Sequence, residues 1–233
     1  MLLYIIRHGE PGENGALTEK GQKQAEAVGE RLFKSGIDRV YSSPLLRARQ
    51  TAEPLCRLLS KEMHIEDWAH EIGDERITTF PDGERKSVSL LQNTVFRTEN
   101  NINLPFDKAF KADGFKESGM EEAVKYIEEN GDNFLEKLGY KKENGVYRIL
   151  RNNDEKVALF CHAAFGRAWI SSLLHIPIHI MWASFDYAHS GVTVLEFQNN
   201  ENGITAPVCL CYSDLSHLYA NNLSLCIDER VEM

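Results

Sequence analysis

The N-terminal part of the chain alternates short apolar runs with amphipathic segments, and this alternation limits the fold more than any other feature. Residues 2–6 form an apolar run of strand length, and residues 18–36 carry apolar side chains at helical spacing. Residues 38–42 are typical of a second short strand, and Pro44 is well placed in the first turn of a second helix. Strand, helix, strand, helix is the pattern of a parallel sheet covered by helices. We therefore predict an α/β fold, a three-layer α/β/α sandwich around a mostly parallel central sheet.

The same pattern returns near the C-terminal end of the chain. Residues 157–161 predict a strand and residues 163–174 predict an amphipathic helix. Residues 192–197 and 207–212 predict further strands. These elements extend the same sheet.

The middle of the chain differs in composition from both ends. Residues 76–156 are polar, with Lys- and Glu-rich stretches and one clear helix at about residues 118–138. A chain of 233 residues has room for one large domain with an insertion. We therefore predict a single domain over residues 1–233, in which residues 76–156 form a lid or a side wall.

The charge of the chain limits its partners. It carries 26 basic and 35 acidic residues, a formal net charge of −9 at pH 7. Such a surface repels nucleic acid and anionic membranes, so any phosphate group must be held by a local positive pocket. No apolar run is long enough to span a membrane, and the apolar stretch in MLLYIIRHGE is too short for a signal peptide. We expect a cytoplasmic protein with no nucleic-acid or membrane partner.

The five cysteines are scattered and odd in number, which favours reduced thiols over a disulfide framework. Cys209 and Cys211 are two residues apart and would share one face of the strand predicted there. Because no second cysteine pair follows with the spacing of a zinc site, we expect buried packing rather than metal binding for both.

Charged residues occur at three places where a predicted strand leads into a helix. Arg7 and His8 follow the first strand, Arg47 lies in the first turn after the second, and His162 follows the strand at 157–161. Ligands of open α/β sheets bind at these carboxyl ends, and both arginines and helix N-termini bind phosphoryl oxygens. A neutral imidazole in this anion pocket is a nucleophile toward phosphorus, and the cations around it should lower its pKa.

Three motifs near the N-terminus stand in a fixed order: RHGE at residues 7–10, LTEKGQKQA at 17–25 and SSPLLRARQTA at 42–52. They resemble the signature segments of the histidine phosphatase superfamily, which includes the cofactor-dependent phosphoglycerate mutases and the α-ribazole phosphatases. The resemblance is strong over residues 1–75 and 156–220 and faint between them. It implies a phosphoglycerate mutase-like fold and favours the phosphatase branch.

The resemblance also implies a role for each matching residue. His8 would be the phosphorylated nucleophile. Arg7 and Arg47 would bind the phosphoryl oxygens. His162 matches the second histidine of the family, which contacts the phosphoryl group and stabilises its charge during transfer.

Three further positions follow or depart from the family's pattern. Asn14 lies where that pattern has a phosphate-binding asparagine, although Pro11 replaces the usual threonine. Ala163 stands where a glycine usually follows the second histidine, and its methyl group is expected to narrow the pocket. His217 lies in a segment that resembles the family's closing NDxSHL, and we expect it to be a packing residue.

A leaving oxygen must take up a proton, so an acid is needed near the nucleophile. The family supplies it after its third strand, and WAHEIG at residues 68–73 matches that pattern best, which makes Glu71 the candidate. Asp67, Asp74 and Glu75 are alternatives. A solvated loop surface is the competing explanation for all four acids.

We therefore predict an enzyme, a phosphatase that hydrolyses a small phosphorylated metabolite without a metal or other cofactor. Phosphoglycerate mutase-type transfer is the first alternative, but the Arg-Arg-rich segment usual in that group is not found here. A non-catalytic module that binds phosphorylated ligands is disfavoured because the two histidines and two arginines are all retained. A metallohydrolase is disfavoured because no ligand motif stands beside His8 or His162. The prediction allows for a homodimer, and the sequence does not identify the substrate.

Overall fold

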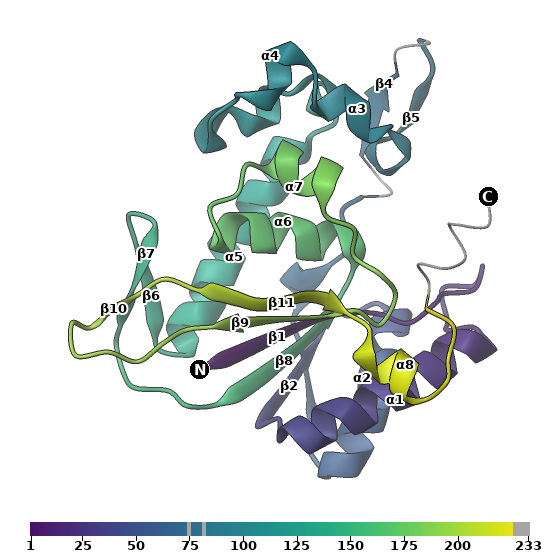
Figure 1. The fold of residues 1–233 in the computed structure, drawn as a ribbon, viewed down its shortest axis with the longest axis vertical. Helices are drawn as coiled ribbons and strands as arrows, with labels where there is room; N and C mark the ends of the chain where they lie inside the picture. The colour runs from purple at the N-terminus through teal and green to yellow at the C-terminus, as the bar shows by residue number, and fades with distance from the viewer. Residues whose placement is uncertain (74–75, 81–82, 226–233) are drawn as a thin grey trace.

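The centre of the computed structural model, which describes residues 1–73, 76–80 and 83–225, is a six-stranded sheet with the order β11-β9-β1-β8-β2-β3 (Figure 1). Strand β9 is antiparallel to both of its neighbours, and the other strands run in one direction. The predicted mostly parallel sheet is therefore confirmed. The strands are β1 (Leu2–Arg7), β2 (Arg39–Ser42), β3 (Met63–Ile65), β8 (Lys156–Cys161), β9 (Val192–Glu196) and β11 (Val208–Asp214).

Helices cover both faces of this sheet, as the three-layer prediction requires. Side chains of β1 alternate between the two faces, so that Tyr4 and Ile6 join one apolar cluster while Leu3 and Ile5 join the other. The face with Tyr4 and Ile6 is covered by α1 (Glu19–Ser35) and α2 (Leu46–Leu59). The face with Leu3 and Ile5 is covered by α5 (Met120–Lys137) and α6 (Ala163–Leu173), and α7 (Ile178–Ser184) packs on α6.

No helix in the described part of the chain is long and apolar enough to cross a membrane.

Helix α1 begins and ends where its sequence signals predict. The Thr18 side chain accepts a hydrogen bond from Gly21 N at 3.0 Å, which satisfies one of the free N–H groups of the first turn. Gly36 closes the helix in the left-handed conformation, at a φ of 73°. These two caps fix the length of α1, which returns the chain from the carboxyl end of β1 to the start of β2.

Residues 76–156 form three parts of the structure: short elements before α5, helix α5 itself, and a hairpin after it. Helix α5 matches the predicted helix at 118–138 and packs beside α6 on the sheet. The part before α5 consists of short elements, some of which pack on α7, and the part after it forms a hairpin that pairs with β10 (Ile204–Thr205). A role of this segment as a lid or side wall stays a prediction. Its shorter elements are β4 (Ile77–Thr79), β5 (Arg85–Ser87), η2 (Val88–Leu90), α3 (Asn93–Phe96), α4 (Glu99–Ile102), η3 (Phe106–Lys111), η4 (Asp113–Phe115), β6 (Tyr140–Glu143) and β7 (Val146–Ile149).

Strand β11 contains an irregularity that corrects the expectation for its cysteines. The register with β9 shifts between Cys209 and Cys211, so that these residues pair with Leu195 and Val194. Cys209 therefore packs against the cluster on one face of the sheet and Cys211 against the cluster on the other. The prediction that both thiols share a face was wrong, because a bulge interrupts the two-residue alternation of the strand.

Candidate active site

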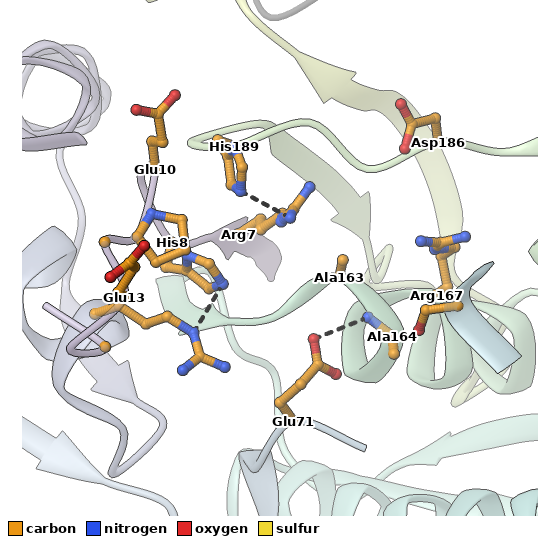
Figure 2. A pocket seen from close by; sticks show the side chains of 15 residues that line it. Arg7, His8, Glu10, Glu13, Glu71, Ala163, Ala164, Arg167, Asp186 and His189 are labelled. Carbon is orange, nitrogen blue, oxygen red and sulfur yellow. Dashed lines mark hydrogen bonds between the residues drawn. The ribbon is translucent and has the colours of Figure 1, made fainter. Parts of the chain in front are cut away.

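A pocket of about 650 Å3 opens at the carboxyl ends of β1 and β8, the edge of the sheet where the sequence places its charged residues. Figure 2 shows its side chains arranged around one space. Four predicted site residues line it, namely Arg7, His8, Arg47 and Glu71. The other lining residues are Glu10, Pro11, Gly12, Glu13, Gly15, Ser89, Ala163, Ala164, Arg167, Asp186 and His189.

The three sequence motifs pack against one another and hold the turn after β1. Gly9 N donates to Thr51 Oγ1 at 2.9 Å, and Glu10 N donates to Gln24 Oε1 at 2.8 Å. A Cβ atom on Gly9 would lie 2.6 Å from the carbonyl oxygen of Gly21, so only glycine permits this approach of two backbones. The backbone on which His8 stands is therefore fixed by residues from all three motifs.

The hydrogen bonds of His8 define its tautomer. Its Nδ1 lies 2.7 Å from the carbonyl oxygen of Gly9, which can only accept, so Nδ1 carries the proton. Its Nε2 lies 3.1 Å from Nε of Arg47, which can only donate. The lone pair of His8 is therefore on Nε2, on the side of the imidazole that faces Arg47.

Burial and neighbouring cations keep His8 neutral. Burial is the largest cause, followed by the positive charge of Arg7 and then that of Arg47, and together they lower the pKa of His8 to about 2. The hydrogen bond to Gly9 O acts in the opposite direction and is outweighed. The sequence predicted the contribution of the cations to this pKa but not the larger contribution of burial.

Arg7 is held from the segment between α7 and β9. Its guanidinium donates to the carbonyl oxygen of Tyr187, and its Nη2 lies 2.8 Å from Nε2 of His189. Ser190 N donates to the carbonyl oxygen of His8 at 3.1 Å, which brings this segment against β1. The ring centre of His189 lies 5.6 Å from that of His8. The sequence pattern did not indicate His189, because this residue precedes its strand, whereas charged side chains were expected only where a strand ends. Strand β9 is antiparallel to β1, so its first residues lie at the same edge as the site.

His162 lies next to His8 and is not among the residues that line the pocket. It is fully buried, its ring centre is 5.1 Å from that of His8, and its Nε2 is 2.7 Å from Oγ of Ser43. Its Nδ1 has no hydrogen-bond partner among the described residues. Burial and the nearby His8 ring hold the pKa of His162 well below its ordinary value. His162 is therefore a neutral imidazole beside the proposed nucleophile.

Glu71 reaches the pocket from the loop after the short helix η1 (Asp67–Ala69). Its Oε1 accepts hydrogen bonds from Ile72 N at 2.8 Å and from Phe165 N at 3.1 Å. The backbone N–H groups of the first turn of α6 thus hold the Glu71 carboxyl group in position. The loop and α6 together fix Glu71 in the same space as His8 (Figure 2).

The remaining predicted residues lie elsewhere. Asn14 is exposed and does not line the pocket, because its Oδ1 accepts from Ala16 N at 3.0 Å within the same loop. Asp67 is exposed and also lies outside the pocket lining. Asp74 and Glu75 are outside the described residues, and so is Cys226. Within the described ranges, no three His, Cys, Asp or Glu side chains come together as a group that could hold a metal ion.

His217 is buried, with its Nε2 at 2.9 Å from Oγ of Ser190. Burial lowers its pKa to about 4. His8, His162 and His217 thus stay neutral in the folded chain but take up protons below about pH 6.5 once it unfolds. Protons then favour the unfolded state, so stability falls as the pH falls.

We expect each of these three histidines to lower the free energy of unfolding by about 1.4 kcal/mol between about pH 7.5 and pH 5.5. Urea unfolding at the two pH values measures the loss. His217→Asn should reduce the loss by about that amount. An equal loss in His217→Asn and the unaltered chain would show that His217 does not contribute.

The comparison with protein families agrees with this geometry. Residues 3–86 match the model of the histidine phosphatase superfamily, branch 1. A probable phosphoglycerate mutase of Erwinia tasmaniensis is 44% identical over 61 residues, which cover 22% of this chain and 28% of the relative. A mitochondrial serine/threonine-protein phosphatase of Drosophila ananassae is 44% identical over 59 residues, which cover 22% of this chain and 20% of the relative. The match thus spans about a quarter of the length of these relatives.

Solved structures share the fold over almost the whole chain. The phosphoserine phosphatase of Entamoeba histolytica in complex with 3-phosphoglyceric acid is 24% identical, covers 93% of this chain and 98% of its own, and has a TM-score of 0.59. The α-ribazole phosphatase of Shigella flexneri is 19% identical, covers 91% of this chain and 96% of its own, and has a TM-score of 0.57. The N-terminal part of the chain is thus similar to the histidine phosphatase superfamily, and the chain as a whole shares the fold of these solved phosphatases.

Proposed function

We propose that this protein is a phosphatase that hydrolyses phosphomonoesters in two steps through a phosphohistidine on His8. One observation carries the proposal. The Nε2 lone pair of His8 lies next to the Arg47 side chain in a pocket that Arg7 also lines, so the nucleophile and the cations that bind phosphoryl oxygens occupy one space.

In the first step, His8 Nε2 forms a bond to phosphorus while the bond from phosphorus to the ester oxygen breaks. The electron pair of that bond goes to the leaving oxygen, which takes a proton from Glu71. The Nε–H of Arg47, which donates to His8 Nε2 in the structure, becomes a donor to a phosphoryl oxygen. Arg7, fixed by Tyr187 and His189, stabilises charge on the same group.

In the second step, water attacks the phosphohistidine. The carboxylate of Glu71 takes a proton from the water, the bond between phosphorus and Nε2 breaks, and its electron pair returns to the imidazole. Inorganic phosphate leaves, and both His8 and Glu71 regain their starting protonation states. The two steps together conserve atoms and charge with water as the only co-substrate.

The proposed partner is a small phosphorylated metabolite, which the arginine-lined pocket supports, and the proposed location is the cytoplasm, where the scattered, odd-numbered cysteines would stay reduced. Mutase activity is the second candidate, because a curated relative is named a probable phosphoglycerate mutase. Incubation of the purified protein with phosphoglycerate and catalytic bisphosphoglycerate in EDTA separates the two. We expect release of inorganic phosphate without isomerisation, and the same release from p-nitrophenyl phosphate. Isomerisation without phosphate release would establish the mutase instead, and loss of activity in EDTA would contradict the metal-independent mechanism.

Replacement of Glu71 tests its role as the acid. An alkoxide leaving group needs a proton far more than nitrophenolate does, and acid catalysis is typically worth about 10² to 10⁴-fold. Glu71→Gln should therefore slow phosphorylation of His8 by glycerol phosphate much more than phosphorylation by p-nitrophenyl phosphate. Single-turnover measurement isolates this step from the hydrolysis that both substrates share.

Asp67→Asn is the control, since Asp67 lies outside the pocket lining and should affect neither substrate. Equal losses for the two substrates in Glu71→Gln would remove Glu71 from the acid role.

A further inference from the structure

The imidazole of His189 lines the pocket beside the proposed nucleophile (Figure 2). It stands in the segment between α7 and β9, and its ring centre lies 5.6 Å from that of His8. Hydrogen bonds hold this segment on both sides of the ring. Ser190 N donates to the carbonyl oxygen of His8 at 3.1 Å, and Ala188 N donates to Oγ of Ser213 at 2.9 Å. His189 therefore has a defined place in the site.

The contact between His189 and Arg7 defines the tautomer of His189. Nη2 of Arg7 lies 2.8 Å from Nε2 of His189, and a guanidinium can only donate. Nε2 of His189 is therefore the acceptor and carries a lone pair, and the proton of the neutral ring is on Nδ1. Arg7 also donates to the carbonyl oxygen of Tyr187, two residues earlier in the same segment. An imidazole lone pair thus orients an arginine that lines the catalytic pocket.

A proton on Nε2 of His189 would remove this hydrogen bond. An imidazolium has two N–H donors and no acceptor, so the guanidinium of Arg7 would lose its partner on the ring. Two positive charges would then face each other at the distance of a hydrogen bond, and they repel each other there. His8 and His162 are buried, whereas His189 is half-buried at the pocket wall, where protons from the solvent reach it.

We propose that His189 is a positioning residue, whose neutral imidazole holds Arg7 against the transferring phosphoryl group and whose protonation releases Arg7 and slows the transfer. This inference rests on the proposed phosphatase function. The competing account is that protonated His189 binds the phosphoryl group directly as a further cation. That account predicts an activity that rises as the pH falls, and the contact of Nε2 with a group that only donates argues against it.

Other titratable groups surround His189, so a test has to separate their effects from its own. Apart from Arg7 and the histidines, the charged side chains that line the pocket are Glu10, Glu13, Arg47, Glu71, Arg167 and Asp186. His217, which contacts the segment of His189, adjoins the ion pair of Arg31 and Asp214. All of these groups, and the ionisation of the substrate, are common to the unsubstituted protein and to a variant at position 189. Their effects therefore cancel in the ratio of the two kcat/KM values at each pH.

His189→Gln and His189→Leu form a matched pair of variants. Glutamine brings an amide oxygen near the position of Nε2 and cannot be protonated, whereas leucine has no acceptor. With p-nitrophenyl phosphate at about pH 8, kcat of His189→Leu should fall by about ten- to a hundredfold, as loss of a hydrogen bond to a charged group allows. His189→Gln should recover most of this loss, because its oxygen accepts from Arg7.

The pH profile tests the effect of the proton. We expect kcat/KM of the unsubstituted protein, divided by that of His189→Gln, to fall by about tenfold or more between about pH 8 and about pH 5, the range in which histidine ordinarily ionises. His64→Gln is the control, because His64 is exposed and lies outside the pocket lining, and its ratio should not change with pH. Thermal melting at each pH confirms that the variants are folded.

A ratio that stays flat or rises as the pH falls would overturn the inference, and so would full activity of folded His189→Leu. Nitrogen NMR of histidine-labelled protein gives a readout without turnover. The signals missing from His189→Gln belong to His189, and at about pH 8 its Nε2 should be the unprotonated nitrogen. A proton on Nε2 at that pH would contradict the role of its lone pair. Failure of the phosphatase function is seen separately, as absence of p-nitrophenyl phosphate turnover by the unsubstituted protein.

Discussion

The His8→Ala variant is expected to lose turnover of every phosphomonoester by about 10⁴-fold or more, because no other side chain replaces a covalent nucleophile. His8 Nε2 is the imidazole nitrogen that carries a lone pair toward Arg47, and the neighbouring His162 ring is fully buried, with Nε2 engaged by Ser43. Release of phosphate from p-nitrophenyl phosphate under saturating conditions measures the loss.

Two controls separate lost chemistry from lost structure. His8→Asn keeps a donor for the carbonyl oxygen of Gly9 but has no nucleophile, so it should be as inactive as His8→Ala. Both variants should still bind inorganic phosphate, because Arg7 and Arg47 remain in the pocket. Substantial turnover in either variant would contradict the phosphohistidine mechanism.

The second large effect is expected at Arg47. Its Nε–H contacts His8 Nε2 at 3.1 Å, so this guanidinium both orients the nucleophile and lies where charge develops during transfer. Removal of one preorganised donor of this kind typically lowers kcat by about 10² to 10³-fold, and we expect Arg47→Ala to fall in that range. Arg47→Lys should recover only part of the loss, because lysine lacks the planar fork.

Arg49→Ala is the matched control on the same helix, since Arg49 is exposed and lies outside the pocket lining. It should keep the kcat of the unsubstituted protein. Activity of Arg47→Ala within about threefold of that value would contradict the role of Arg47.

The parts of the fold that the sequence predicts well are those with strong local signals. Strands β1 and β8 are apolar runs buried on both faces, and α1 carries both of its caps in the sequence. The hairpin of β6 and β7 was missed because its strands are four residues long and partly exposed. The bulge in β11 depends on pairing with β9, which no local pattern in residues 207–212 encodes.

The residues of the site also fall into those that the sequence predicts and those that depend on the tertiary structure. Arg7 ends β1, His8 follows it, and Arg47 lies in the first turn of the helix after β2, so the sequence pattern brings them to the carboxyl ends of neighbouring parallel strands. Glu71 was suggested only by the family resemblance, and the structure places it in the same pocket. His189 and Arg167 could not be predicted in this way, because their positions depend on the direction of β9 and on the packing of α7 against α6. The absence of Asn14 from the pocket lining follows from a side-chain bond within its own loop.

Trapping the covalent intermediate tests the central claim most directly. The protein is mixed rapidly with an aryl phosphate, quenched in alkali, in which phosphohistidine is stable, and digested for mass spectrometry. The mechanism predicts a phosphoryl group on His8 that forms before steady state, approaches one per chain when hydrolysis is the slower step, and is absent from His8→Asn. Phosphate release at the full rate with no protein-bound phosphoryl group, or with that group on another residue, would contradict it.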